Sequence, residues 1–208
     1  MPESATAPAV ATDADRGCMR LFVPAAVLAI GLGYALGGRL SRLAALRLRW
    51  PALAMVGLAL QLVTGPGDVV PVAALYLSFA LLIAFALVNI RTAGFALVLI
   101  GVLLNLTAIV VNDGMPVSRA ALVASGQADT LGDLVSGETV KHHLAGPGDD
   151  LVFLGDVIAV PALEQVVSVG DVFVYGGFVL VVALAMRGRV RSAPGRGLAV
   201  TEGVPDGA

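Results

Sequence analysis

Four ionisable residues in the second half of the chain have the types needed for acid–base chemistry: Lys141, His142, Asp156 and Asp171. Lys141 and His142 are adjacent, and each aspartate directly follows a glycine. A histidine acts as a general base when a carboxylate lies within hydrogen-bond reach and orients it. The same side chains can instead fasten a loop, because partial desolvation strengthens charge pairing. In that case we expect Asp156 or Asp171 to lie within ion-pair or hydrogen-bond distance of Lys141, His142 or backbone amides at a helix start. The residues leave both interpretations open and name no catalytic residue.

The sequence lacks the residue patterns of several other common kinds of site. His142 and His143 are neighbours, so they point in different directions on a helix, and no cysteine cluster accompanies them; neither a metal site nor a cofactor is expected. No serine stands in a Gly-x-Ser-x-Gly motif. With 13 basic and 15 acidic residues, the net charge of −2 offers no basic surface for nucleic acid. The single cysteine excludes a framework of disulfides.

The elements that must position these residues are apolar helices. The chain is 58% hydrophobic and only 13% charged, which is typical of a membrane protein. About 20 apolar residues are needed to cross a bilayer as a helix. Five segments qualify, and the last carries Asp171 near its start. The sequence therefore predicts an all-α integral membrane bundle of five transmembrane helices, with spans at about 21–38, 50–67, 69–90, 92–112 and 166–186.

Polar residues inside the spans are few. Asn105 and Asn112 are seven positions apart and share one helix face, so we expect interhelical hydrogen bonds, with a small hydrophilic pocket as the alternative. Gly176 and Gly177 favour a close approach between helices, as do Gly31 and Gly33.

The arginines predict the orientation, because short loops rich in Lys and Arg stay in the cytoplasm. They gather in the first and third connections and after the last span: Arg39, Arg42, Arg47, Arg49, Arg91, Arg187, Arg189, Arg191 and Arg196. This distribution predicts a multi-pass protein of the cell membrane with its N-terminus outside and its C-terminus in the cytoplasm. The membrane domain would cover 19–187, between a disordered N-terminal extension (1–18) and a disordered cytoplasmic tail (188–208).

The long outer loop, 113–165, has room for a site. It carries eight acidic residues against Arg119 and Lys141. Ser118 and Gly126 have the types that begin and end a short helix between them, and a second apolar stripe follows from Leu131 to Val140. The apolar stretch 151–160 is too short for another span and favours a re-entrant or interfacial segment. The sequence thus predicts a partly helical extracytoplasmic loop.

Several short motifs occur in a fixed order along the chain. Gln61 is followed by Asn112-Asp113-Gly114-Met115-Pro116-Val117, then Lys141-His142, then Phe153-Leu154-Gly155-Asp156-Val157-Ile158 with Pro161, and finally Ser168-Val169-Gly170-Asp171-Val172. Together they resemble a family of small bacterial multi-pass membrane proteins known only as a domain of unknown function. The chain departs from that pattern at Asp113, where glycine is expected. The resemblance implies a membrane bundle without an assigned activity, and the residues at its motif positions are Asn112, Met115, Pro116, Lys141, His142, Asp156 and Asp171.

Two hypotheses of function follow. In the first, the protein is a non-enzymatic bundle whose outer loop folds back over the helix ends and binds a lipid, a small envelope molecule or a membrane-protein partner. In the second, it is a membrane-embedded enzyme that acts on a lipid-linked substrate, with His142 as general base and Asp156 or Asp171 orienting it. The sequence does not indicate the oligomeric state or the ligand.

Overall fold

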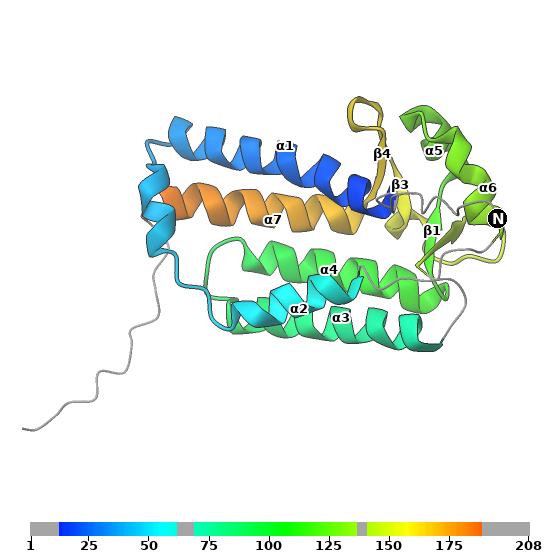
Figure 1. Ribbon diagram of the computed structural model, residues 1–208, viewed down its shortest axis with the longest axis horizontal. Coiled ribbons are helices and arrows are strands. Elements are labelled where there is room, and N and C mark those ends of the chain that lie inside the picture. Colours follow the sequence, from blue (N-terminus) through cyan, green and yellow to red (C-terminus); the bar gives the residue numbers. More distant parts are fainter. Residues whose placement is uncertain (1–12, 62–68, 137–140, 189–208) are drawn as a thin grey trace, which may run out of the picture.

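The computed structural model describes residues 13–61, 69–136 and 141–188 of the 208-residue chain. Five helices lie roughly side by side, and a cap of short helices and strands closes one end of this bundle (Figure 1). The bundle helices are α1 (Asp13–Ala35), α2 (Pro51–Gln61), α3 (Val69–Val88), α4 (Phe95–Val111) and α7 (Val169–Met186). Contacts join α1 to α7, α7 to α4, α4 to α3 and α3 to α2. The buried core lies mainly between α3 and α4, and Val181 of α7 joins the smaller of its two clusters.

Helix ends differ from the predicted spans because local turns begin and end the helices. Helix α1 begins at Asp13, inside the segment 1–18 that was predicted to be disordered, and residues 1–12 lie outside the described ones. Gly94 has a left-handed conformation (φ 99°) directly before α4, so that helix starts later than predicted. The predicted tail, 188–208, lies outside the description except for Gly188.

One helix of the bundle has the length and apolar composition of a membrane span. Among the described residues, α7 alone is both long and apolar enough to cross a membrane, by length and composition. The apolar helical stretches Arg20–Ala35, Pro51–Gln61, Val72–Val88 and Phe95–Val111 are shorter than this criterion requires. The predicted set of five spans is therefore not established by helix length.

The cap contains a small sheet, so the all-α prediction was incomplete. Strands β1 (Met115–Val117) and β2 (His142–Leu144) pair in parallel, β1 and β3 (Asp156–Val160) also pair in parallel, and β3 pairs antiparallel with β4 (Gln165–Ser168). The strand order is β2-β1-β3-β4. The fifth predicted span began at 166, but Val166 to Ser168 belong to β4, and the helix starts only at Val169.

Short helices complete the cap. Helix α5 (Arg119–Ser125) confirms the predicted caps: the Ser118 hydroxyl accepts a hydrogen bond from Ala121 N, and Gly126 ends the helix in a left-handed conformation. Helix α6 (Leu131–Ser136) covers the start of the second predicted stripe. The stretch 151–160, which was predicted to be a re-entrant or interfacial segment, forms the 3₁₀ turn η3 (Val152–Leu154) and strand β3, whose backbone groups pair within the sheet. Its place at a membrane stays a prediction. Two further 3₁₀ turns are η2 (Ala128–Thr130) and η4 (Pro161–Leu163).

Glycines allow α4 and α7 to touch backbone to backbone. A Cβ at Gly177 would lie 2.7 Å from Gly94 O, and one at Gly94 would lie 2.6 Å from Gly177 O. Two turns away along α7, a Cβ at Gly170 would lie 2.7 Å from Gly101 O. The predicted close approach at Gly177 is thus confirmed, whereas a Cβ at Gly176 would meet nothing within 4 Å. At the other side of α7, Gly33 of α1 packs against Met186, while Gly31 faces open space.

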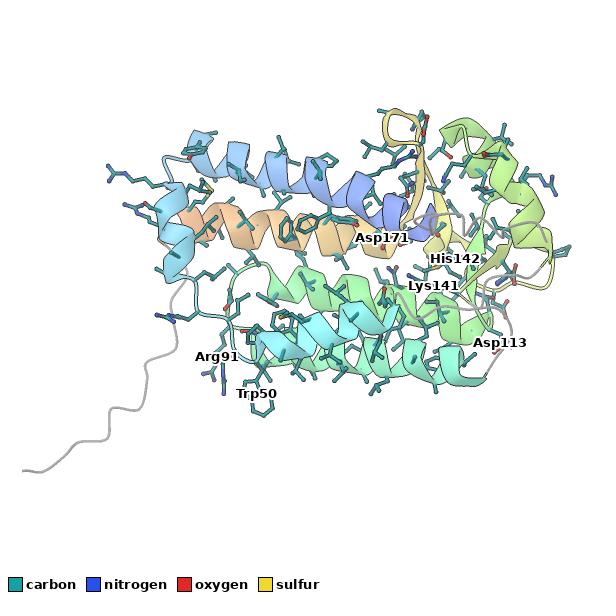
Figure 2. The ribbon with its side chains drawn as sticks, in the orientation of Figure 1. Trp50, Arg91, Asp113, Lys141, His142 and Asp171 are labelled. Atoms are coloured by element: carbon teal, nitrogen blue, oxygen red, sulfur yellow. The ribbon has the colours of Figure 1, made fainter. Side chains whose placement is uncertain are left out.

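The end of the bundle opposite the cap is closed by the turn η1 (Leu40–Ala45). Arg39 N donates to Met186 O, and the Arg42 guanidinium donates to Arg187 O. On the same side, the Asn89 side chain forms two hydrogen bonds with the backbone of Arg49. Basic residues of three separate segments therefore gather at this end, as Figure 2 illustrates with Arg91 beside Trp50.

Candidate functional site

The residues singled out in the sequence meet where the cap joins the bundle. Lys141 and His142 stand at the start of β2, Asp156 begins β3, and Asp171 lies in the first turn of α7. Figure 2 places Lys141, His142 and Asp171 at this end of the bundle, far from Trp50 and Arg91. The sheet is responsible for this arrangement, because it joins three strands from distant parts of the sequence.

Asp171 fastens the start of α7. One carboxylate oxygen, Oδ2, accepts a hydrogen bond from Ser168 N at 3.0 Å, and the Ser168 hydroxyl accepts one from Asp171 N at 2.9 Å. This reciprocal pair is a capping box, which satisfies two backbone donors that a helix start leaves open. The other oxygen, Oδ1, accepts from Asn105 Nδ2 at 2.8 Å. The prediction that Asp156 or Asp171 binds backbone amides at a helix start is confirmed by Asp171.

Asn105 connects α4 to this capping box. Its amide donates to Asp171, and its carbonyl oxygen accepts a hydrogen bond from the Ser168 hydroxyl at 2.8 Å. Ser168 is fully buried. The predicted interhelical hydrogen bond at Asn105 is therefore confirmed. Ser168 and Asp171, three residues apart and ahead of an apolar run, have the spacing of a capping box, but the sequence did not indicate that Asn105 of α4 also binds Ser168.

Asp156 is a buried carboxyl group next to His142. It pairs with Val117 and Ser168 in the sheet, and its side chain is only 12% exposed. Asp156 Oδ2 lies 3.5 Å from His142 Nε2. Burial raises the pKa of Asp156 to about 8, the negative charge of Asp171 raises it further, and Lys141 partly opposes this. At neutral pH the carboxyl group therefore holds its proton and is a hydrogen-bond donor.

His142 is held in its neutral form. Its pKa is lowered to about 3, first by burial and then by the positive charges of Lys141 and His143, although about 33% of its side chain remains exposed. A base with so low a pKa takes up a proton poorly at neutral pH, since efficient general bases have pKa values near the working pH. The His142–Asp156 contact is thus between a neutral imidazole and a neutral carboxyl group, which suits a hydrogen bond better than base catalysis.

Lys141 does not form the predicted ion pair. Its ammonium contacts Gln61 Oε1, at the end of α2, at 3.4 Å, and no ion pair with Asp156 or Asp171 is present in the part of the chain that the structure describes. The sheet explains the difference: the backbone of Lys141 binds Met115 N at the sheet edge, and the side chain then extends toward α2. Gln61 was quoted among the motif residues, but its partner could not be inferred from spacing.

Asn112 clamps the loop before η3. Its side-chain amide accepts a hydrogen bond from Asp150 N at 2.7 Å and donates one to Asp150 O at 2.9 Å. Asn89 makes the same two-point contact with Arg49 at the far end of the bundle, a role that the sequence did not indicate. Asn105 and Asn112 therefore bind two different segments of the cap: Asn105 binds Ser168 at the end of β4, and Asn112 binds Asp150 in the loop before η3.

Met115 and Pro116 are structural residues in this arrangement. Met115 is 3% exposed and belongs to the hydrophobic core with Leu75, Ile109 and Leu154. Pro116 is fully buried, and a Cβ at Gly155 would collide with its backbone oxygen. Both residues fix β1 in the middle of the sheet rather than contacting an open site.

His143 and Asp149 form an ion pair that the sequence had missed. His143 Nε2 lies 3.0 Å from Asp149 Oδ1, and Asp149 Oδ2 accepts a hydrogen bond from Gly146 N at 2.7 Å. That backbone hydrogen bond and the histidine lower the pKa of Asp149. From its place after Gly146-Pro147-Gly148, the sequence predicts that Asp149 lies in a solvated turn. Residues 146–148 are exposed, but the Asp149 side chain itself is held by His143 and Gly146 N. Across the described residues, no three His, Cys, Asp or Glu side chains converge in a way that could hold a metal ion.

Comparison with known proteins adds one assignment. The model of a family of unknown function, DUF5317, matches residues 45–183, two thirds of the chain. The chain belongs to this family. The DUF5317 match runs from the end of η1 into α7, so it includes every candidate site residue and leaves out α1. No activity is assigned to the family, and the match by itself shows neither a bacterial source nor a membrane location. No curated protein and no solved structure matches the chain.

The pKa values of this DUF5317 protein predict that its stability falls as pH rises from 6.5 to 8. Folded Asp156 has a pKa of about 8 instead of 3.8, so the folded state binds more protons over that interval and loses stability as they leave. His142, with a folded pKa of about 3 instead of 6.5, has the opposite effect at lower pH. Between pH 4 and 6.5 the two effects oppose each other, and above 6.5 only that of Asp156 remains.

Melting temperatures in detergent across this pH range test the prediction. Asp156→Asn, which is neutral at every pH, should flatten the decline between pH 6.5 and 8. Asp129→Asn, a change at an exposed cap residue, should retain the wild-type slope. An unchanged slope in Asp156→Asn would assign the decline to another group.

Proposed function

We propose that this protein is a multi-pass protein of a bacterial cell membrane, with α1, α2, α3, α4 and α7 in the bilayer and a non-enzymatic cap on the outer side. The cap seals the helix ends and presents a binding site for a lipid, a small envelope molecule or a membrane-protein partner. The observation that carries the membrane assignment is the apolar outer surface of the bundle.

Large apolar side chains are exposed on all five helices. Examples are Val27 (66%), Met55 (71%), Leu77 (52%), Val110 (52%) and Val172 (54%). Soluble monomers rarely expose apolar patches beyond a few hundred Å². A surface of this kind around a whole bundle is stable when lipid tails cover it. Helices α4 and α7, with 17 and 18 residues, would extend about 26 and 27 Å, close to the ~30 Å hydrocarbon core.

The charges at the two ends support the proposed orientation. Arg39, Arg42 and Arg187 lie together at the η1 end, and Trp50 at the same end of the bundle is 67% exposed, as is usual for a tryptophan at a membrane interface. The cap at the other end is acidic. The η1 end would thus face the cytoplasm and the cap the outside.

The chemistry of the cap favours binding over catalysis. His142 has a pKa of about 3, and Asp156 is protonated at neutral pH, so neither matches the role of base or orienting carboxylate that an acid–base enzyme would need. Asp171 is engaged by Ser168 and Asn105. The one observation in favour of the enzyme is the 3.5 Å contact between His142 and Asp156, which makes action on a lipid-linked substrate the second candidate.

Thiol labelling of intact cells tests the membrane topology. In a Cys18→Ser background, Ala128→Cys in the cap should react with a membrane-impermeant reagent, whereas Ser41→Cys in η1 should react only after the cells are opened. Both positions are exposed, so burial does not limit either reaction. Labelling of Ser41→Cys from outside would contradict the proposed orientation. Failure of both cysteines to react after lysis would contradict the exposure of these two positions.

A further inference from the structure

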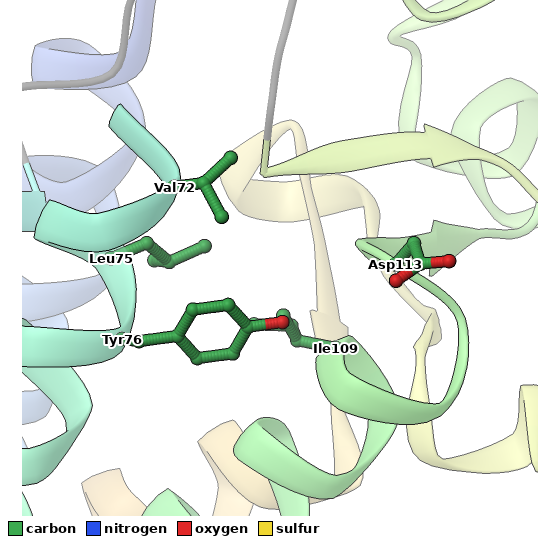
Figure 3. A pocket seen from close by; sticks show the side chains of 5 residues that line it. All are labelled: Val72, Leu75, Tyr76, Ile109 and Asp113. Carbon is green, nitrogen blue, oxygen red and sulfur yellow. The ribbon is translucent and has the colours of Figure 1, made fainter. Parts of the chain in front are cut away.

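A small pocket lies beside the cap, between the first turns of α3 and the last turn of α4. Its lining residues are Val72, Leu75, Tyr76, Ile109 and Asp113, and its volume is about 130 Å³. Figure 3 shows the Tyr76 ring reaching across from α3 with its hydroxyl toward Ile109, and Asp113 on the opposite side. None of the seven candidate site residues lines it, although Asp113 belongs to the motif that begins at Asn112. The pocket is thus separate from the His142–Asp156 contact.

The lining combines an apolar floor with two polar groups. Val72, Leu75 and Ile109 supply hydrocarbon, and Leu75 and Ile109 belong to the buried core. The polar groups are the Tyr76 phenol and the Asp113 carboxylate. Asp113 has no hydrogen bond or ion pair with any other described residue, and it is exposed. A carboxylate and an aromatic ring are both attractive to cations, by charge and by the ring quadrupole.

Lys141 and His143, two basic residues of the cap, are engaged elsewhere. The Lys141 ammonium contacts Gln61, and His143, which packs against Gly114 next to Asp113, is paired with Asp149. They therefore leave the Asp113 carboxylate available to a cation from outside. Asp113 also has a left-handed backbone (φ 51°), which Asp, Asn and Gly tolerate better than other residues, so Asn can replace it without new strain.

We propose that this pocket binds an alkylammonium group, with the ammonium between Asp113 and Tyr76 and the attached carbons on Val72, Leu75 and Ile109. A water molecule takes about 30 Å³ of liquid volume, so the pocket holds roughly four or five non-hydrogen atoms, enough for the three of an aminoethyl group and the oxygen attached to it. Such a group is carried by the headgroup of phosphatidylethanolamine and by free ethanolamine. This inference rests on the proposed function, which places the pocket at the outer membrane interface.

The test uses the full-length protein in detergent, with phosphatidylethanolamine and phosphatidylglycerol of identical acyl chains as probes, and native mass spectrometry to count the retained lipids. The wild type should retain phosphatidylethanolamine in preference to phosphatidylglycerol. Asp113→Asn should weaken that binding by about tenfold, because the charged partner is lost. Asp129→Asn, at an exposed carboxylate of the cap, is the matched control and should bind as the wild type does.

Competition with free ethanolamine separates the two sources. Displacement of the lipid shows that the ammonium group alone is recognised, and continued retention that depends on Asp113 assigns the ligand to the lipid headgroup. Equal retention of the two lipids, or wild-type binding by Asp113→Asn, would overturn the proposal. Those results would leave the topology untouched, since the thiol labelling of Ser41→Cys and Ala128→Cys tests it independently.

Discussion

Gly177→Ala is expected to destabilise the protein by about 2 kcal/mol or more, because the added methyl group has no room. Its Cβ would lie 2.7 Å from Gly94 O and 2.8 Å from Val98 N, both of which are backbone atoms of the neighbouring α4 segment. Backbone atoms cannot move aside as the tip of a flexible side chain can. The two helices would have to separate along the seam that forms the centre of the bundle. The melting temperature in detergent measures the effect.

The adjacent residue provides a matched control. Gly176 lies on the same helix, and a Cβ there would meet nothing within 4 Å. Gly176→Ala should therefore leave stability unchanged or raise it by up to about 1 kcal/mol, through the better helix propensity of alanine. Similar losses in the two variants would show that glycine is needed in α7 for a reason other than the contact with α4.

Asp171→Ala is expected to lower stability by about 2–4 kcal/mol. The substitution removes the acceptor of Ser168 N, which completes the capping box, and it also leaves Asn105 Nδ2 without its partner. Both abandoned donors lie where cap and bundle meet. An unsatisfied buried polar group costs more than the hydrogen bond contributes, so the loss exceeds that of an ordinary cap. Unfolding in detergent, followed by circular dichroism, measures it.

Asp129→Ala is the proper control for this change. Asp129 is exposed and has no hydrogen bond or ion pair with the described residues. Asp149, which its sequence suggested as a solvated reference, is unsuitable because it holds His143 and Gly146 N. A loss in Asp129→Ala as large as in Asp171→Ala would show that general acidity of the cap, rather than the capping box, stabilises this face.

Local features of the cap followed from short stretches of sequence. Ser118 and Gly126 marked the two ends of α5 because a serine hydroxyl satisfies an open backbone amide and glycine accepts a left-handed conformation. The apolar composition likewise indicated the bundle helices, and Asn105 indicated a polar contact between them. In each case the physical cause acts within a few residues, or within one helix face.

The sheet and the partners of the charged residues were decided by tertiary structure. Strand β1 has three residues, one of them Pro116, and its partners β2 and β3 lie far along the chain, so no alternation of polar and apolar residues predicted it. That sheet brings His142 to Asp156 and directs Lys141 to Gln61. The sequence alone shows which polar and charged side chains need a partner if they are buried. Which partner each one received depended on strand pairing between distant segments, and the spacing of residues along the chain does not contain that information.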